Sequence, residues 1–552
     1  MAAGTLRKRK AASGSKVHVR SQSNSSNSNS SEGGQKTAAG DGKKNTALAN
    51  TEGERPSGSG TKRSLTFAVG GVLTLLGVAG YTFFRQPTTE VADQQPVEGA
   101  VATALESVAA KRVEAKKTLD GLKSKERREK AKSLGMLSEE EVDAILHANE
   151  NSWYLDPAKS RALGLRVDTN QVSSNDPIED YLAWSPLGHT TTITPAGSNG
   201  STVVSPQYMF SVFDGHAGFM CAEQLSMRLA PMLNESLGII QTLKSDGGSE
   251  QGSGAKSKEL VTTIKQLEKQ SGIDWDKVPL ALTATFVRMD NELVHGALDE
   301  FRRVQDMGRM DKLLGPAVSG SCGLVAVVDT DAREVVVGNT GDSRALLGVR
   351  LKDGRWKAVR LSEDQTAQNQ KEYTRLAREH PDETVIQRGR VLGGLMPTRA
   401  FGDCRYKWPL EVQQDLFPVL YSRGHRYATT PRDYKTPPYV TAKPVIVRHQ
   451  LSENDRFIVI ASDGLYDQLS DGEVVDAVAQ WYEANNEGRR GLGSLVTEDA
   501  NAATHLIRAA LSTDRLGRRS DSVIRRLLAI PPPHSRRFRD DISVTVVTLN
   551  QD

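Results

Sequence analysis

Tyr208-Met209-Phe210-Ser211-Val212-Phe213 is an apolar run typical of a β-strand, and it leads directly into Asp214-Gly215-His216-Ala217-Gly218. A second run, Arg456-Phe457-Ile458-Val459-Ile460, leads in the same way into Ala461-Ser462-Asp463-Gly464. Each stretch places an aspartate beside a glycine at the end of a predicted strand. A carboxylate at the edge of a core costs free energy unless it is hydrogen-bonded, paired or bound to a cation. Because the two contexts match, we expect Asp214 and Asp463 to share a metal site.

The sequence around these runs predicts a layered α/β fold with antiparallel sheets. Strand-like runs at Cys322 to Asp329 and Glu334 to Gly338 flank the turn Thr330-Asp331-Ala332-Arg333, which is typical of a hairpin. Ala345 to Val349 is expected to continue this set of strands, and Ile542 to Leu549 is the last strand. Helical patterns separate the groups of strands, at Ala217 to Leu233, Leu280 to Phe301, Ala367 to Glu379, Asp471 to Ala484 and Ala500 to Leu511. Clustered strands with helices between the clusters argue against a doubly wound parallel sheet.

Acidic residues recur at the ends of apolar runs, at Glu179-Asp180, Asp214, Asp342, Asp463 and Asp540-Asp541. Any one of them alone more often caps a turn or a helix. Together, carboxylates without a His or Cys set favour Mg²⁺ or Mn²⁺ over zinc. Two such ions close together can activate a water for in-line attack on phosphorus.

Composition excludes several other classes of protein. The chain has 552 residues and a formal net charge of +3, and its folded part carries no concentrated basic stripe of the kind that binds nucleic acid. The three cysteines, Cys221, Cys322 and Cys404, lack CxxC spacing, which argues against a disulfide scaffold or a zinc site.

The N-terminal residues 1–63 are predicted to form a disordered basic tail, because they contain almost no large apolar residues. Met1 to Ser31 contains no acidic residue and has the charge bias of a mitochondrial presequence, namely Arg7, Lys8, Arg9, Lys10, Lys16 and Arg20. Its apolar face is weak, so composition leaves both a presequence and a plain disordered tail open.

Ser64 to Phe84 is uncharged and long enough, at roughly 30 Å as a helix, to cross a bilayer. We predict one transmembrane helix here, since a buried core helix would need a folded domain around it. Basic residues precede it and acidic residues follow it, so the positive-inside rule places the large domain across the membrane. In a mitochondrial inner membrane that side is the intermembrane space. A signal anchor into the secretory pathway is the alternative.

Residues 85–136 are expected to be a linker that includes a solvated charged helix from Lys111 to Lys132. Ser138-Glu139-Glu140-Glu141 then predicts a helical capping box. We expect this helix to open the folded domain, residues 137–552, which contains insertions.

The ordered motifs of the chain resemble those of the metal-dependent type 2C protein serine/threonine phosphatases over Leu137 to Leu549. The motifs are Glu179-Asp180, Asp214-Gly215-His216-Ala217-Gly218, Gly341-Asp342-Ser343-Arg344, Arg399-Ala400-Phe401-Gly402-Asp403, Ser462-Asp463-Gly464 and Asp540-Asp541-Ile542. Within that family the chain is most similar to the mitochondrial pyruvate dehydrogenase phosphatases, through Ile145 to Glu150, Asn175 to Asp180, Ala367 to Asn369 and Gly394 to Asp403.

This resemblance implies an α-β-β-α sandwich of two antiparallel sheets flanked by helices, with a two-metal cleft at one end. Asp214 would bridge two Mg²⁺ or Mn²⁺ ions. The Gly215 carbonyl and Glu179 would bind one ion, and Asp463 and Asp540 the other.

The resemblance also implies roles around the metals. Asp342 would help to hold a third, weaker metal, and Asp180 would orient the metal-bound water. His216 would be the general acid that protonates the departing serine or threonine oxygen. Arg399 and Asp403 would brace the cleft. The substrates would be phosphoserine and phosphothreonine proteins, with the pyruvate dehydrogenase complex as one candidate.

Two positions depart from the family pattern. Asn175 stands where many members have an arginine that grips phosphate, and Tyr181 stands where the closer branch commonly has arginine. A membrane-anchored, non-catalytic phosphoprotein-binding pseudophosphatase is the alternative function. Such relatives generally lack a metal carboxylate, whereas every metal aspartate position is filled here, which favours catalysis. Pyruvate dehydrogenase lies in the matrix, whereas the charge bias places the catalytic domain outside it, so these two expectations conflict.

Overall fold

The structure, a computed structural model, describes residues 95–155, 162–188, 207–245, 255–271, 277–486, 499–514 and 516–550, all within one compact unit. The predicted basic tail (1–63) and the predicted transmembrane helix (64–84) lie outside the described residues. Among the helices of the described ranges, none is long and apolar enough to cross a membrane.

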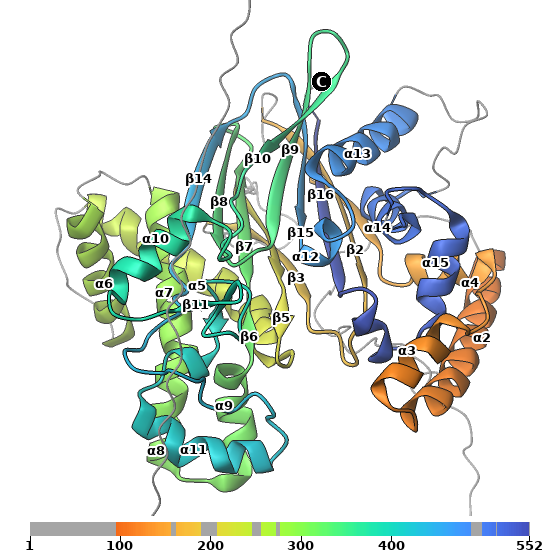
Figure 1. The fold of residues 1–552 in the computed structure, drawn as a ribbon. Coiled ribbons are helices and arrows are strands. Elements are labelled where there is room, and N and C mark those ends of the chain that lie inside the picture. Colours follow the sequence, from red (N-terminus) through yellow and green to blue (C-terminus); the bar gives the residue numbers. More distant parts are fainter. Residues whose placement is uncertain are drawn as a thin grey trace, which may run out of the picture. The chain divides into compact units, whose positions relative to one another are not determined.

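Two large sheets form the centre of the fold (Figure 1). The first has the order β1-β2-β16-β15-β9-β10, with the bounds Asn151–Leu155, Gly164–Val172, Ile542–Asn550, Asp455–Ala461, Arg344–Arg350 and Trp356–Arg360. The second has the order β14-β8-β7-β4-β3, with the bounds Val445–Gln450, Glu334–Thr340, Gly323–Asp329, Gln207–Phe213 and Tyr181–Leu187. All neighbouring strands in both sheets are antiparallel. Two small sheets, β13-β6-β5 and β11-β12, occupy Phe401–Gly402, Gly320–Ser321, Gly215–His216, Ile386–Gln387 and Arg390–Val391.

The central strands are mostly apolar because both of their faces are buried. In β4, Phe210 and Val212 belong to the core between the two sheets, whereas Met209 and Phe213 pack against helices on the other face. Strand β15 divides its side chains in the same way. An antiparallel strand with one solvated face would alternate apolar and polar residues, so the continuous runs indicate a sheet covered on both sides.

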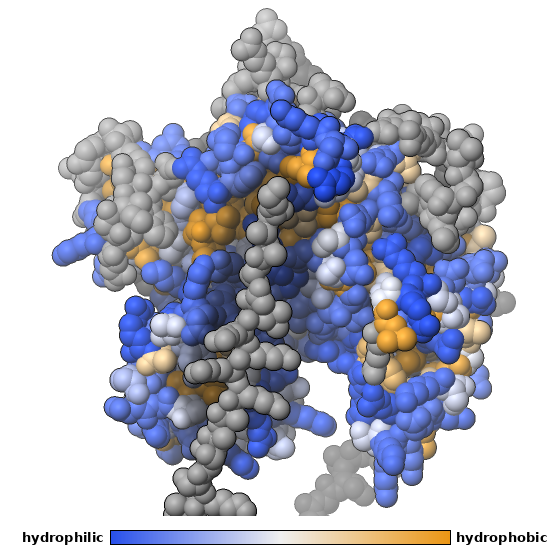
Figure 2. Space-filling view, turned by 45° about the horizontal axis from the view of Figure 1, so that its top comes forward, coloured by the Kyte–Doolittle hydropathy of each residue, from blue (hydrophilic) through white to orange (hydrophobic). Residues whose placement is uncertain are grey.

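Helices cover the outer face of each sheet, as Figure 1 shows. Helices α5 and α7 (Met220–Ser245 and Lys277–Asn291) pack on the five-stranded sheet, and α6 (Ala255–Ser271) packs against these two helices. Helices α4, α13 and α14 (Glu139–His147, Asp471–Asn486 and Ala502–Ser512) pack on the six-stranded sheet, and α15 (Asp521–Ala529) packs against α4 and α14. The predicted α-β-β-α sandwich is therefore confirmed. Hydrophilic residues predominate on the face in Figure 2, where apolar residues show in scattered patches.

Two expected elements differ in detail. The predicted helix from Leu280 to Phe301 consists of α7, a π-helical segment (Glu292–Gly296) and α8 (Ala297–Val304). The indole of Trp408 donates to the Val294 carbonyl in this segment at 3.0 Å, which gives a π-helical carbonyl a partner. The strand expected at Ala345 to Val349 is present as β9, but it pairs with β15 in the other sheet and does not extend the β7-β8 hairpin. The chain thus crosses between the sheets at Asp342.

The charged stretch from Lys111 to Lys132 is not one solvated helix. It forms the end of α2 (Gln95–Asp120) and all of α3 (Ser124–Lys132). Leu119 and Ala131 are buried with Ile530, and the buried Arg112 side chain donates to the Leu528 carbonyl at 3.3 Å. The high charge of the sequence conceals these apolar contacts. The capping box at Ser138 and Glu141 is confirmed at the start of α4.

Candidate active site

The acidic residues singled out in the sequence meet at one edge of the two sheets. Asp214 follows β4, and Glu179-Asp180 precedes its antiparallel neighbour β3. In the other sheet Asp463 follows β15, and Asp540 precedes its antiparallel neighbour β16. Asp342 lies in the crossing from β8 to β9. Antiparallel pairing places the end of one strand beside the start of the next, so residues far apart in sequence share this edge.

Asp214 and Asp342 lie together with a residue that sequence reasoning missed, Cys322. Ligand atoms of these three side chains all lie within 4.8 Å of one another. The Cys322 amide donates to the Asp214 carbonyl at 2.8 Å, and its thiol donates to Asp342 Oδ1 at 3.1 Å. The Asp463 amide approaches Asp214 Oδ2 at 3.5 Å. Cys322 lies here because β7 pairs with both β4 and β8, and no spacing motif in the sequence signals it.

Burial and mutual repulsion raise the pKa values of these carboxyl groups. Burial is the largest cause for Asp214, whose pKa lies well above its usual range, and the charges of Asp463 and Asp180 add to it. The pKa values of Asp180 and Asp463 are likewise well above normal, first from burial and then from neighbouring aspartates. Burial also raises the pKa of Asp540, to about 6. Such a cluster favours either protonation or a bound cation.

The donor set suits a hard divalent cation. Asp180 Oδ2 and Asp463 Oδ1 are buried without a hydrogen-bond partner among the described residues. Within the described ranges, only one ion pair involves a predicted site carboxylate, and it joins Asp540 Oδ2 to Arg536 at 2.5 Å. The predicted site carboxylates are Glu179, Asp180, Asp214, Asp342, Asp463 and Asp540. Buried carboxylate oxygens without donors, clustered with others of like charge, are the ligands that Mg²⁺ and Mn²⁺ take. The residues present therefore fit the predicted metals.

A glycine next to each strand-ending aspartate lets another loop approach closely. A Cβ on Gly215 would lie 2.1 Å from the Glu179 carbonyl oxygen, and a Cβ on Gly464 would lie 2.0 Å from the Asp541 carbonyl oxygen. Glu179 is held further by the Gly218 amide, which donates to its Oε1 at 2.8 Å. These contacts bring Glu179 next to the Asp214 loop, and Asp541 next to the Asp463 loop.

Asp541 organises the loop that carries Glu179. Its carboxylate accepts from the Glu179 amide at 2.9 Å, the Asn175 amide at 3.0 Å, the Asn175 side-chain amide at 2.9 Å and the Ser174 amide. Asn175, which stands where many family members have an arginine, therefore braces the loop through Asp541. Sequence reasoning grouped Asp541 with Asp540 but gave it no role, since its partners lie more than 360 residues away in the chain.

His216 is held by Asp403. Its Nε2 lies 2.6 Å from Asp403 Oδ2. Burial alone would lower the pKa of His216, but the charge and hydrogen bond of Asp403 outweigh it and raise that pKa above normal. Arg399 makes two hydrogen bonds to the Glu372 carboxylate, at 3.0 and 2.7 Å. Asp403 thus positions His216, and Arg399 positions Glu372, as expected of residues that support the cleft.

Comparison with known proteins agrees with the resemblance seen in the sequence motifs. Residues 189–515, more than half of the chain, match the family model described as protein phosphatase 2C. The Saccharomyces cerevisiae protein "[Pyruvate dehydrogenase [acetyl-transferring]]-phosphatase 1, mitochondrial" is 32% identical over 468 residues, covering 76% of this chain and 74% of that protein. The human "[Pyruvate dehydrogenase [acetyl-transferring]]-phosphatase 2, mitochondrial" is 32% identical over 467 residues, covering 75% and 84%.

A protein phosphatase 2C homologue of Schizosaccharomyces pombe is 35% identical over 403 residues, covering 70% of this chain and 80% of that protein. The family model, these relatives and the carboxylate edge of an antiparallel sandwich agree. The chain therefore belongs to the protein phosphatase 2C family and is a metal-dependent protein serine/threonine phosphatase.

Proposed function

We propose that this phosphatase works with two Mg²⁺ or Mn²⁺ ions held by Asp214, the Gly215 carbonyl, Glu179, Asp463 and Asp540, and that Asp342 helps to hold a weaker third. One observation carries the proposal: buried carboxylates from both sheets converge with raised pKa values, and two of their oxygens have no donor among the described residues. Bound ions would neutralise this charge and supply an activated water for in-line attack on phosphorus.

The protein's own groups have distinct roles in this proposal. Asp180 is buried and orients the attacking water. His216 protonates the departing serine or threonine oxygen. Its Nε2 contacts Asp403, so Nδ1 is the nitrogen that transfers the proton, and Asp403 keeps the ring charged and oriented. The pseudophosphatase alternative is not favoured, because every predicted metal carboxylate is present at the shared edge.

We further propose a mitochondrial location with residues 64–84 as a single inner-membrane helix and the catalytic domain in the intermembrane space. The names of the yeast and human relatives and the basic tail support mitochondria, and the charge bias around residues 64–84 supports the orientation. Pyruvate dehydrogenase is a candidate substrate, by the names of these relatives, if the domain reaches the matrix instead. The secretory pathway is the alternative location.

Replacing Asp214 by Asn should abolish the reaction without unfolding the protein. We expect Mn²⁺-dependent phosphate release from a phosphoserine peptide to fall by roughly 100-fold or more, because a shared ligand is lost. Thermal unfolding in chelator should occur at the same temperature or higher, since one of several like charges is removed. Asp382→Asn, an exposed aspartate outside the site, is the matched control. Turnover like that of the wild type in Asp214→Asn would remove this residue from the site.

Replacing His216 by Gln should affect substrates according to their leaving group. Phosphopeptide turnover should fall by roughly 10²- to 10⁴-fold, because an alkoxide leaves poorly without a proton. Turnover of p-nitrophenyl phosphate should fall much less, since nitrophenolate needs no proton to depart. Equal losses on both substrates, measured as kcat, would contradict the general-acid role.

The protein without metal should become less stable as pH rises. The folded-state pKa of Asp540 is about 6 and its ordinary value is 3.8, so the folded state binds the extra proton and loses this stabilisation as pH rises through 6. In chelator, the free energy of unfolding of the wild type should fall between about pH 4 and pH 7, by about 1–3 kcal/mol more than that of Asp540→Asn. Saturating Mn²⁺ should remove this fall. Denaturant unfolding at each pH measures the free energy of unfolding of both proteins. If it falls equally with pH in the wild type and in Asp540→Asn in chelator, the raised pKa of Asp540 is contradicted.

Protease protection tests the compartment. In isolated mitochondria the domain should resist added protease, and in mitoplasts, whose outer membrane is opened, it should be digested while matrix markers survive. Protection in mitoplasts would place the domain in the matrix and restore pyruvate dehydrogenase as an accessible substrate. Absence of the protein from mitochondria would favour the secretory alternative.

A further inference from the structure

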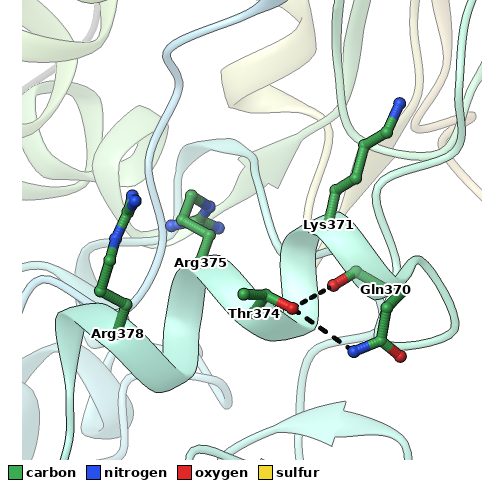
Figure 3. A pocket seen from close by; sticks show the side chains of 5 residues that line it. All are labelled: Gln370, Lys371, Thr374, Arg375 and Arg378. Carbon is green, nitrogen blue, oxygen red and sulfur yellow. Dashed lines mark hydrogen bonds between the residues drawn. The ribbon is translucent and has the colours of Figure 1, made fainter.

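Helix α10 (Gln370–Glu379) carries a basic stripe that the catalytic site does not use. Lys371, Arg375 and Arg378 stand at helical spacing, and Figure 3 shows all three rising from the same side of the helix. They line a groove of about 330 Å³ with Gln370 and Thr374. A neighbouring cavity of about 210 Å³ shares the three basic residues and adds Glu363, Gln365, Asn369, Glu372, Arg399 and Val445.

The groove has an excess of positive charge. Four cationic side chains and two carboxylates line the two cavities together. Lys371 pairs with Glu363 at 2.7 Å, but these side chains are 76% and 47% exposed, so the pair is weak and can exchange for another anion. Arg378 is exposed and has no carboxylate partner among the described residues. Arg375 is more constrained, since it is held by Glu372 and Glu379.

The length of the stripe points to an extended ligand. Lys371 and Arg378 are seven positions apart, which is roughly 10 Å along a helix. A single phosphate or carboxylate cannot contact both ends. An extended peptide rises roughly 3.3 Å per residue, so about three consecutive residues would span the stripe.

The smaller cavity next to the groove is connected to the catalytic edge through Gln365. Gln365 lines the smaller cavity, and its side-chain carbonyl accepts from the Gly341 amide at 2.8 Å. Its side-chain amide donates to the Asn339 carbonyl at 2.8 Å. Gly341 directly precedes Asp342. The smaller cavity beside the groove is therefore one hydrogen-bonded residue away from the segment that carries a site carboxylate.

We propose that the α10 groove binds a short acidic segment of the phosphoprotein substrate, separate from the residue that is dephosphorylated. This inference rests on the proposed phosphatase function. Carboxylate side chains at successive positions would pair with Lys371 and Arg378, and Gln370 and Thr374 would offer polar contacts beside them. The groove would select substrates by charge and leave the chemical step unchanged.

Two phosphopeptides that differ only in a tract of three Glu or three Gln residues test this. The wild type should have the lower KM for the Glu peptide. The double variant Lys371→Glu/Arg378→Glu should lower kcat/KM for the Glu peptide by roughly tenfold through KM, with kcat unchanged. Turnover of the Gln peptide and of p-nitrophenyl phosphate should stay near the wild-type values.

Lys352→Glu/Arg355→Glu, on the exposed turn between β9 and β10, makes the same change of charge away from the groove and is the control. An equal loss in this control, or an equal loss of the α10 variant on both peptides, would overturn the proposal. If the wild type fails to hydrolyse even p-nitrophenyl phosphate in Mn²⁺, the proposed metal-dependent function itself fails, so the two failures are distinguishable.

Discussion

The repulsion among buried carboxylates at one sheet edge is the constraint on which the rest of this structure depends. The pKa values of Asp180, Asp214 and Asp463 are each raised chiefly by burial and then by the charges of neighbouring aspartates. Bringing such groups together destabilises the folded state unless a bound cation neutralises their charge. The surrounding loops are correspondingly fixed by hydrogen bonds to backbone amides, with Asp541 as the clearest case.

The positions of the acidic residues could be predicted from the sequence because each marks the end of a buried strand. Asp214 and Asp463 were found from local pattern alone, and antiparallel pairing then brings their partners to the same edge. The layered fold followed from clustered strands with helices between them. The specific roles came from the resemblance of ordered motifs to a known family.

Other features depend on register and packing, which a single sequence does not contain. Cys322 reaches Asp342 because β7 pairs with β8, and it reaches Asp214 because β7 also pairs with β4. The role of Asp541 arises from contacts across most of the chain. The transfer of β9 to the six-stranded sheet depends on the turn at Asp342, and local hairpin patterns cannot show it. The packing of α2 through Leu119 is hidden within a highly charged stretch.

The two halves of the site are built alike. In each sheet an Asp-Gly pair ends one strand, an acidic pair begins the antiparallel neighbour, and the glycine admits a carbonyl from the acidic pair. The proposed metal ligands come from both halves, with Asp214 and Glu179 beside one sheet and Asp463 and Asp540 beside the other. If these residues bind ions as proposed, cation binding and the docking of the sheets form a single thermodynamic equilibrium. Bound metal ions would then link the two layers, and the affinity of the site for these ions would determine whether one layer can unfold locally while the other stays folded.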